Sequence, residues 1–187
     1  MGIRLGCAVV VLAGLLLGAA CGSDSSAADK AKAASETLQK GLQAHAAGNL
    51  KEAEKNYRKA IADDDQNAFA YYDLGLIEQT TGRPSDAEKH YRRALVLDPN
   101  MTSALFNLAI LRTQAGATDE ARQLYTRVIS LDPKNAGAHL NLGFLLQGQN
   151  QDKEAEKEFK TAVSIDPSLR SRIPAGADRP AGSDSSG

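Results

Sequence analysis

Apolar and polar positions in the middle of the chain recur with a period of 34 residues. Inside one period, Leu74 and Ile77 keep the spacing of one helix face, and Ala87 and Tyr91 keep it in the following stretch. The intervening residues Gly82-Arg83-Pro84 interrupt the pattern. A three- and four-residue spacing of apolar side chains is typical of an amphipathic helix. Each period therefore predicts two helices joined by a short turn.

The copies lie at 34–67, 68–101, 102–135 and 136–169, with no insertion between them. Small residues on both helices of a copy let the backbones approach, and a Tyr or Phe fills the space beside that contact. Four columns of equivalent residues carry the pattern. They are Leu97-Asp98-Pro99, Leu131-Asp132-Pro133 and Ile165-Asp166-Pro167; Ala53, Ala87, Ala121 and Ala155; Tyr57, Tyr91, Tyr125 and Phe159; and Gly41, Gly75, Ala109 and Gly143.

This unit resembles the tetratricopeptide repeat (TPR) family, which has the same period and the same small, aromatic and proline pattern. The resemblance covers 34–169 and implies an all-α fold, an α-solenoid of four helix-turn-helix units. Glu78 and Arg112 depart from the family, which usually has Tyr there, and Val128 replaces an alanine. The alternative is an ordinary helical bundle without a solenoid.

Residues 1–20 are predicted to be a signal peptide. One positive charge precedes an apolar run from Leu5 to Leu17, which is shorter than the roughly 20 residues of a spanning helix. Small residues then lead to Cys21, in an arrangement that resembles a bacterial lipobox, although Gly18 stands where that motif usually has Leu. The resemblance implies that Cys21 is diacylated and becomes the mature N-terminus.

Two alternatives stay open for this segment: an ordinary signal peptide cleaved near Ala20, and an uncleaved membrane anchor. A lipidated Cys21 would mean that the protein is exported and anchored in the bacterial cell membrane or outer membrane. Residues 21–33 are predicted to be a flexible linker after the lipidated cysteine, and residues 170–187 a disordered tail. Both contain the sequence Gly-Ser-Asp-Ser-Ser, which cannot bury apolar surface.

The resemblance implies a curved stack in which the first helix of each repeat lines a concave groove. Equivalent positions there are apolar, with one polar row, which suits an extended or helical peptide that offers backbone groups. In the alternative interpretation, the amides satisfy local backbone groups and the aromatic rings pack between repeats. A carboxylate clamp is disfavoured, because Asp73 would repel a carboxylate. The predicted partner-binding residues are Phe69, Tyr72, Asp73, Leu76, Phe106, Asn107, Ile110, Leu140, Asn141 and Phe144.

Composition narrows the function further. The chain has 22 Lys and Arg against 23 Asp and Glu, so it lacks the basic surplus of a nucleic-acid binder. The sequence contains no motif of a nucleotide-binding, metal-dependent or ester-hydrolysing enzyme. Both cysteines, Cys7 and Cys21, precede the repeats. We therefore expect no catalysis, cofactor or metal. The prediction is a protein- or peptide-binding adaptor at the cell envelope, and the alternative is a self-associating structural protein.

Overall fold

The computed structural model describes residues 22–174 of the chain. Within these residues the fold is all-α, with helices that alternate with short turns and no strand. The predicted all-α solenoid is confirmed. The helices are α1 (Gly22–Ala46), α2 (Leu50–Asp63), α3 (Ala68–Thr80), α4 (Pro84–Leu97), α5 (Thr102–Gln114), α6 (Thr118–Leu131), α7 (Ala136–Gly148), α8 (Asp152–Ile165) and the 3-10 helix η1 (Pro167–Arg172).

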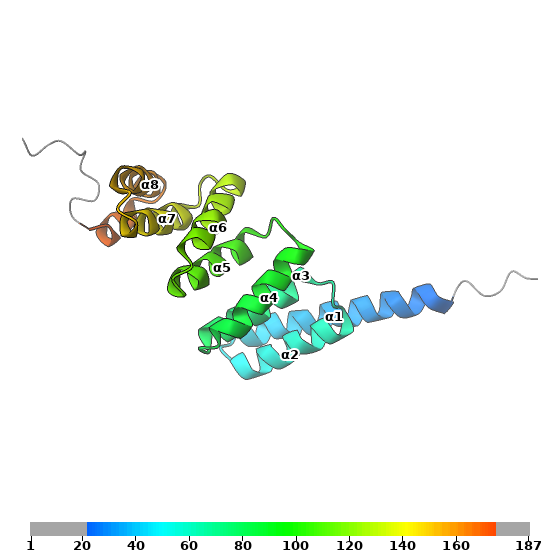
Figure 1. The fold of residues 1–187 in the computed structure, drawn as a ribbon. Coiled ribbons are helices and arrows are strands. Elements are labelled where there is room, and N and C mark those ends of the chain that lie inside the picture. Colours follow the sequence, from blue (N-terminus) through cyan, green and yellow to red (C-terminus); the bar gives the residue numbers. More distant parts are fainter. Residues whose placement is uncertain (1–21, 175–187) are drawn as a thin grey trace, which may run out of the picture.

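Consecutive helices form antiparallel hairpins, and the hairpins stack in chain order (Figure 1). The stack runs from α1 and α2 at one end to α7 and α8 at the other, so the two ends of the described chain lie far apart. Each pair contacts mainly the next pair, because α2 packs on α3, α4 on α5 and α6 on α7. This nearest-neighbour packing is what brings equivalent residues of successive repeats into line.

The turn between repeats depends on an aspartate at the end of each second helix. Asp64, Asp98, Asp132 and Asp166 each accept a hydrogen bond from the backbone N–H two residues on, at 3.0 to 3.1 Å. Such an Asx turn gives the chain an alternative to another helical turn. The first copy lacks the proline, having Asp65 at that position, yet it has the same turn.

The core repeats along the stack as the sequence does. The alanine and tyrosine or phenylalanine columns of the second helices have at most 2% of their surface exposed. Opposite them, the glycines of the first helices leave room for the ring. A Cβ at position 75 would lie 2.8 Å from Cε1 of Tyr91, and one at position 143 would lie 2.6 Å from Cδ1 of Phe159. The close approach of the two helices therefore requires glycine at both positions.

The turn inside each repeat uses a left-handed residue. Gly82 has φ of +77°, and Asn150 has φ of 58° in the fourth copy, where no glycine is present. Asparagine tolerates this conformation better than other residues with a side chain.

Two predicted disordered segments are partly wrong. Helix α1 begins at Gly22 and includes most of the expected linker 21–33. The physical reason is that residues 27–34, Ala-Ala-Asp-Lys-Ala-Lys-Ala-Ala, are mainly strong helix formers. At the other end, η1 and Ile173 are ordered: Ile173 is only 8% exposed in the core, and Leu169 packs against the same cluster. The rest of the tail lies outside the described residues.

The signal-peptide prediction for 1–20 and the lipidation prediction for Cys21 also fall outside the described part of the chain. Within 22–174, no helix has both the length and the apolar character needed to cross a membrane.

Candidate functional site

The predicted groove residues lie on α3, α5 and α7, the first helices of the second, third and fourth repeats. Phe69 is 63% exposed, which is unusual for an aromatic side chain in a folded domain. Most of the others are half-buried, so they offer part of their surface to a partner without losing their contacts. The half-buried members are Tyr72, Asp73, Leu76, Phe106, Asn107, Ile110, Asn141 and Phe144.

Leu140 does not belong to this surface. Its side chain has no exposed area and lies in the core of the third and fourth repeats. Phe106 and Phe144 are partly buried and pack against that core cluster. The prediction that Leu140 contacts a partner is therefore wrong, because its side chain is enclosed in this core.

The groove aromatics also have structural contacts. The ring of Phe106 packs edge-on against Tyr125 at 6.0 Å between centroids, and Phe144 against Phe159 at 5.1 Å. A Cβ at Gly137 would come within 3.2 Å of Phe106, so this ring also contacts the next repeat. Phe106 thus packs partly between repeats, as the alternative interpretation expects, whereas the ring contact of Phe144 lies inside its own repeat. The surface that both rings leave exposed forms the apolar part of the predicted groove.

The polar row is partly satisfied by tyrosines. Nδ2 of Asn107 donates to the hydroxyl of Tyr72 at 3.3 Å. The amide of Asn141 helps to lower the pKa of the Tyr125 phenol, although burial raises that pKa more strongly. Each amide therefore retains capacity for a further hydrogen bond, because a side-chain amide has two donors and an acceptor.

Asp73 differs from the two asparagines in its column. Among the residues that the structure describes, none forms a hydrogen bond or ion pair with its carboxylate. Burial raises the pKa of Asp73 to about 6. The charge of Asp73 also contributes to the raised pKa of Tyr57 on α2, where burial is the larger cause. The groove thus contains one poorly solvated carboxylate without a cationic partner.

Acidic residues on the second helices pair with arginines of the following repeat, although the i,i+4 charge pairs in the sequence indicate only a solvated face. Arg83 forms two hydrogen bonds with Glu54 of the preceding repeat, at 2.9 and 2.7 Å. The hydrogen bond from Arg83 lowers the pKa of Glu54 to about 2. In the next joint, Arg112 lies 3.0 Å from Glu88 and 2.7 Å from Glu120. These contacts hold neighbouring hairpins together outside the apolar core.

Glu78 is the most buried of these charges. It has no exposed surface, and its carboxylate lies 3.0 Å from Nη2 of Arg58 and 2.5 Å from Nδ1 of His90. His139 is only 7% exposed and lies 2.6 Å from Glu158. In the described residues, no three His, Cys, Asp or Glu side chains gather as a metal site requires. The contact between Arg58 and Glu78 is an ion pair, and His90 and His139 each share a hydrogen bond with a carboxylate.

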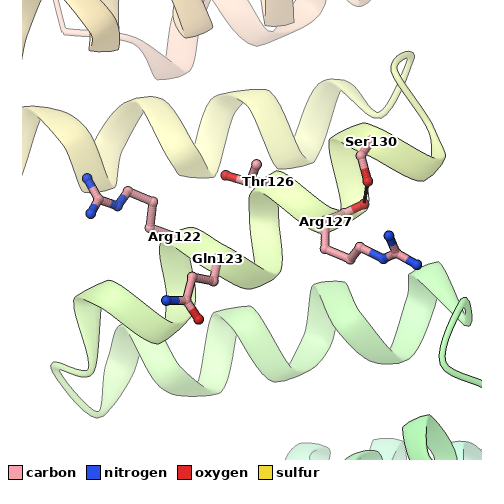
Figure 2. Close-up of a pocket in the computed structure, with 5 residues that line it drawn as sticks. All are labelled: Arg122, Gln123, Thr126, Arg127 and Ser130. Atoms are coloured by element: carbon pink, nitrogen blue, oxygen red, sulfur yellow. Dashed lines mark hydrogen bonds between the residues drawn. The ribbon is translucent and has the colours of Figure 1, made fainter.

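Two shallow hollows lie on the second helices and not in the groove. One, of about 410 Å³, is lined by five residues of α6, which Figure 2 shows projecting from a single helix. The other, of about 400 Å³, is lined by residues of α2. Sequence reasoning missed both, and their only signal is the run of exposed polar positions on these helices. The lining residues are Arg122, Gln123, Thr126, Arg127 and Ser130 on α6, and Lys51, Glu54, Lys55 and Arg58 on α2.

Comparison with known proteins identifies the family of the repeats. The family model for the middle TPR-like domain of cilia and flagella-associated protein 70 matches residues 41–140, and a tetratricopeptide repeat model matches residues 112–173. No curated protein matches the sequence.

Solved structures share the arrangement of the helices. MamA is 24% identical with a TM-score of 0.67, and the alignment covers 80% of this chain and 89% of MamA. The pilF protein of Pseudomonas aeruginosa is 25% identical with a TM-score of 0.65, over 74% of this chain and 64% of that one. YrrB, described as a TPR protein with an unusual peptide-binding site, is 25% identical with a TM-score of 0.64, over 77% and 78% of the two chains.

Proposed function

The chain belongs to the tetratricopeptide repeat family, and from that premise we propose that it is a non-catalytic adaptor that binds a protein segment in its concave groove. The observation that carries the proposal is the exposed ring of Phe69 beside a polar row on three consecutive first helices. Apolar surface of this kind on a folded repeat marks an interaction site when it adjoins further apolar and polar groups.

The neighbouring structures support the same function. YrrB shares the stack of helices and is described as having a peptide-binding site. In this chain the amides of Asn107 and Asn141 recur one repeat apart, so an extended segment can meet both. Half-buried apolar side chains flank them and supply burial on binding. Backbone hydrogen bonds then give affinity, and side-chain contacts give specificity.

Photo-cross-linking tests the groove even while the partner is unidentified. Phe69→p-benzoylphenylalanine places a reactive group in the groove, and Val96→p-benzoylphenylalanine places it on α4. Val96 is the matched control, because it is also an exposed apolar residue, at 69% against 63%. We expect a discrete adduct in intact cells from position 69 and none from position 96. Adducts from position 96 alone would move the binding surface to the second helices.

A double variant then tests the polar row. Asn107→Ala with Asn141→Ala should remove the adduct at position 69 while thermal unfolding stays within a few degrees of the wild type. Two lost hydrogen bonds, at about 0.5–1.5 kcal/mol each, correspond to roughly tenfold weaker binding or more. An adduct between two copies of the chain would instead support the self-associating alternative. Self-association could use the groove or the C-terminal end of the stack, and Leu169 and Ile173 already cover part of that end.

We further propose that the adaptor is exported and held at the bacterial envelope by a lipid on Cys21. Support comes from the apolar run and the small residues that precede this cysteine. Intact mass of the membrane-extracted protein should show acyl chains and the loss of residues 1–20. Cys21→Ser should abolish the modification, whereas Cys7→Ser, inside the apolar run, should leave it unchanged. A mature protein with unmodified Cys21 would overturn this part of the proposal.

A further inference from the structure

The groove carries a local feature on α3 that its polar row does not explain. Phe69 and Asp73 are four residues apart in one helix, so their side chains lie on the same face about one turn apart. The ring is largely exposed, and the carboxylate is half-buried. The two side chains therefore border the same part of the groove.

Asp73 is the only charged residue among the groove columns of the described repeats. Its own column continues with Gln39, Asn107 and Asn141, and the column of Phe69 continues with Ser35, Ser103 and Gly137. The remaining two columns are apolar or aromatic. Any net charge that a partner meets in these columns is therefore the negative charge of Asp73.

Within residues 22–174, no cationic side chain pairs with Asp73. The titratable groups that face it are the phenols of Tyr57 on α2 and Tyr91 on α4, and the charge of Asp73 adds to the raised pKa of both. Burial, the largest cause for each phenol, keeps these rings neutral at physiological pH. A half-buried carboxylate without a partner is costly, and a cation within a few ångströms would offset that cost.

We propose that the groove selects a partner segment that carries a lysine or arginine, whose alkyl stem lies against Phe69 and whose charged group meets Asp73. This inference rests on the proposed groove function and names the chemistry of its partner. A cation beside an aromatic ring and a carboxylate gains from both, and the stem covers the exposed ring. The same carboxylate disfavours an acidic segment, because like charges repel in a half-buried site.

A random library of linear peptides, selected against the full chain, tests the proposal. We expect the enriched peptides to share one Lys or Arg beside apolar residues. Replacing that residue with Gln in the peptide should weaken binding to the wild-type chain about tenfold, since charge-assisted hydrogen bonds are the stronger kind. With the Asp73→Asn chain, the same peptide change should have little effect.

The chain offers matched controls for this experiment. Asparagine already occupies this column at positions 107 and 141, so Asp73→Asn introduces a residue that the repeat accommodates. Asp86→Asn removes the same charge from α4, where Asp86 pairs with Lys89 outside the groove. The Asp86→Asn chain should discriminate between the Lys or Arg peptide and its Gln variant as strongly as the wild type does.

The two hypotheses can fail separately. Peptides that lose binding to the Asn107→Ala, Asn141→Ala chain but show no preference for a basic residue would overturn the inference and leave the groove function standing. Peptides that bind the double variant as tightly as the wild type, or a library without binders, would overturn the groove function and the inference with it.

Discussion

The carboxylate of Glu78, a departure from the usual repeat pattern, lies 2.5 Å from Nδ1 of His90. Glu78 has no exposed surface and lies in the joint between the first two repeats, where the family usually has an aromatic residue. Arg58 of the preceding repeat completes the group at 3.0 Å. A buried acid therefore replaces a packing contact with an ion pair that connects α2, α3 and α4.

We predict that Glu78→Ala destabilises the chain by about 2–3 kcal/mol. The substitution leaves a cavity and removes the carboxylate that Arg58 and His90 share. Glu78→Gln should cost less, since it retains the volume and one acceptor. Urea unfolding followed by circular dichroism measures both. Glu154→Ala, an exposed acid on α8, is the control and should stay within about 0.5 kcal/mol of the wild type. Equal midpoints for Glu78→Ala and Glu154→Ala would contradict the role of the buried pair.

Gly75 should tolerate no side chain. Its missing Cβ would meet the buried ring of Tyr91 at 2.8 Å, so Gly75→Ala should lower stability by about 1–3 kcal/mol through overpacking. The same substitution at Gly148, where nothing lies within 4 Å, should be neutral or stabilising by up to about 1 kcal/mol. Thermal unfolding of the two variants gives the comparison. A Gly75→Ala protein as stable as Gly148→Ala would show that the helices can separate at little cost.

The cost of replacing Gly82 should come from its backbone conformation and not from a steric clash of the new side chain. No atom would obstruct a Cβ there, but its φ of +77° is unfavourable for residues with a side chain. We expect Gly82→Ala to cost about 1 kcal/mol and Gly82→Asn to cost less. Asn150 supports this order, because it already adopts a φ of 58° in the fourth repeat. Denaturant midpoints that rank alanine above asparagine would be inconsistent with a left-handed turn at position 82.

Asp73 should make stability fall as pH rises. Burial raises its pKa from 3.8 to about 6 in the folded chain, whereas the unfolded chain keeps the ordinary value. Ionisation therefore costs nothing below about pH 4, and its full cost is present above about pH 6. Since the groove is partly solvated, we expect Asp73→Asn to be more stable than the wild type by about 1–2 kcal/mol near pH 8.

The advantage of Asp73→Asn should shrink toward zero near pH 4, which chemical denaturation at several pH values can measure. Asp86→Asn is the control of opposite sign, because a hydrogen bond from Lys89 lowers the pKa of Asp86. Removing that carboxylate should not stabilise the chain at high pH. A pH-independent gain for Asp73→Asn would mean that its carboxylate is already well solvated.

Much of the fold can be predicted, because the repeat imposes the same packing problem four times. The glycine at 75 and the tyrosine at 91 are sixteen positions apart, yet the columns to which they belong are enough to identify them as facing residues. The start of α1 cannot be predicted in the same way. It lies outside the repeat, and the polar Gly-Ser-Asp-Ser-Ser sequence conceals the helix-forming residues that follow.

The sequence predicts the groove only as a set of columns. Equivalent positions differ in burial: Tyr72 and Phe106 are half-buried, whereas Leu140 in the same column has no exposed area. The pairing of Arg83 with Glu54 also escapes the sequence pattern. It crosses from one repeat to the next, and a periodic pattern shows which residues are equivalent but not which ones touch.

Helix α1 has a mechanical consequence if Cys21 carries a lipid. The helix starts at the residue after this cysteine, and its first part extends beyond the hairpin formed with α2 (Figure 1). Twelve residues from Gly22 to Ala33 correspond to roughly 18 Å of rigid rod, at about 1.5 Å per residue. A flexible tether would let the repeats tumble freely near the bilayer. A stiff strut instead fixes their stand-off distance and couples the tilt of the whole stack to the angle at which α1 leaves the membrane surface.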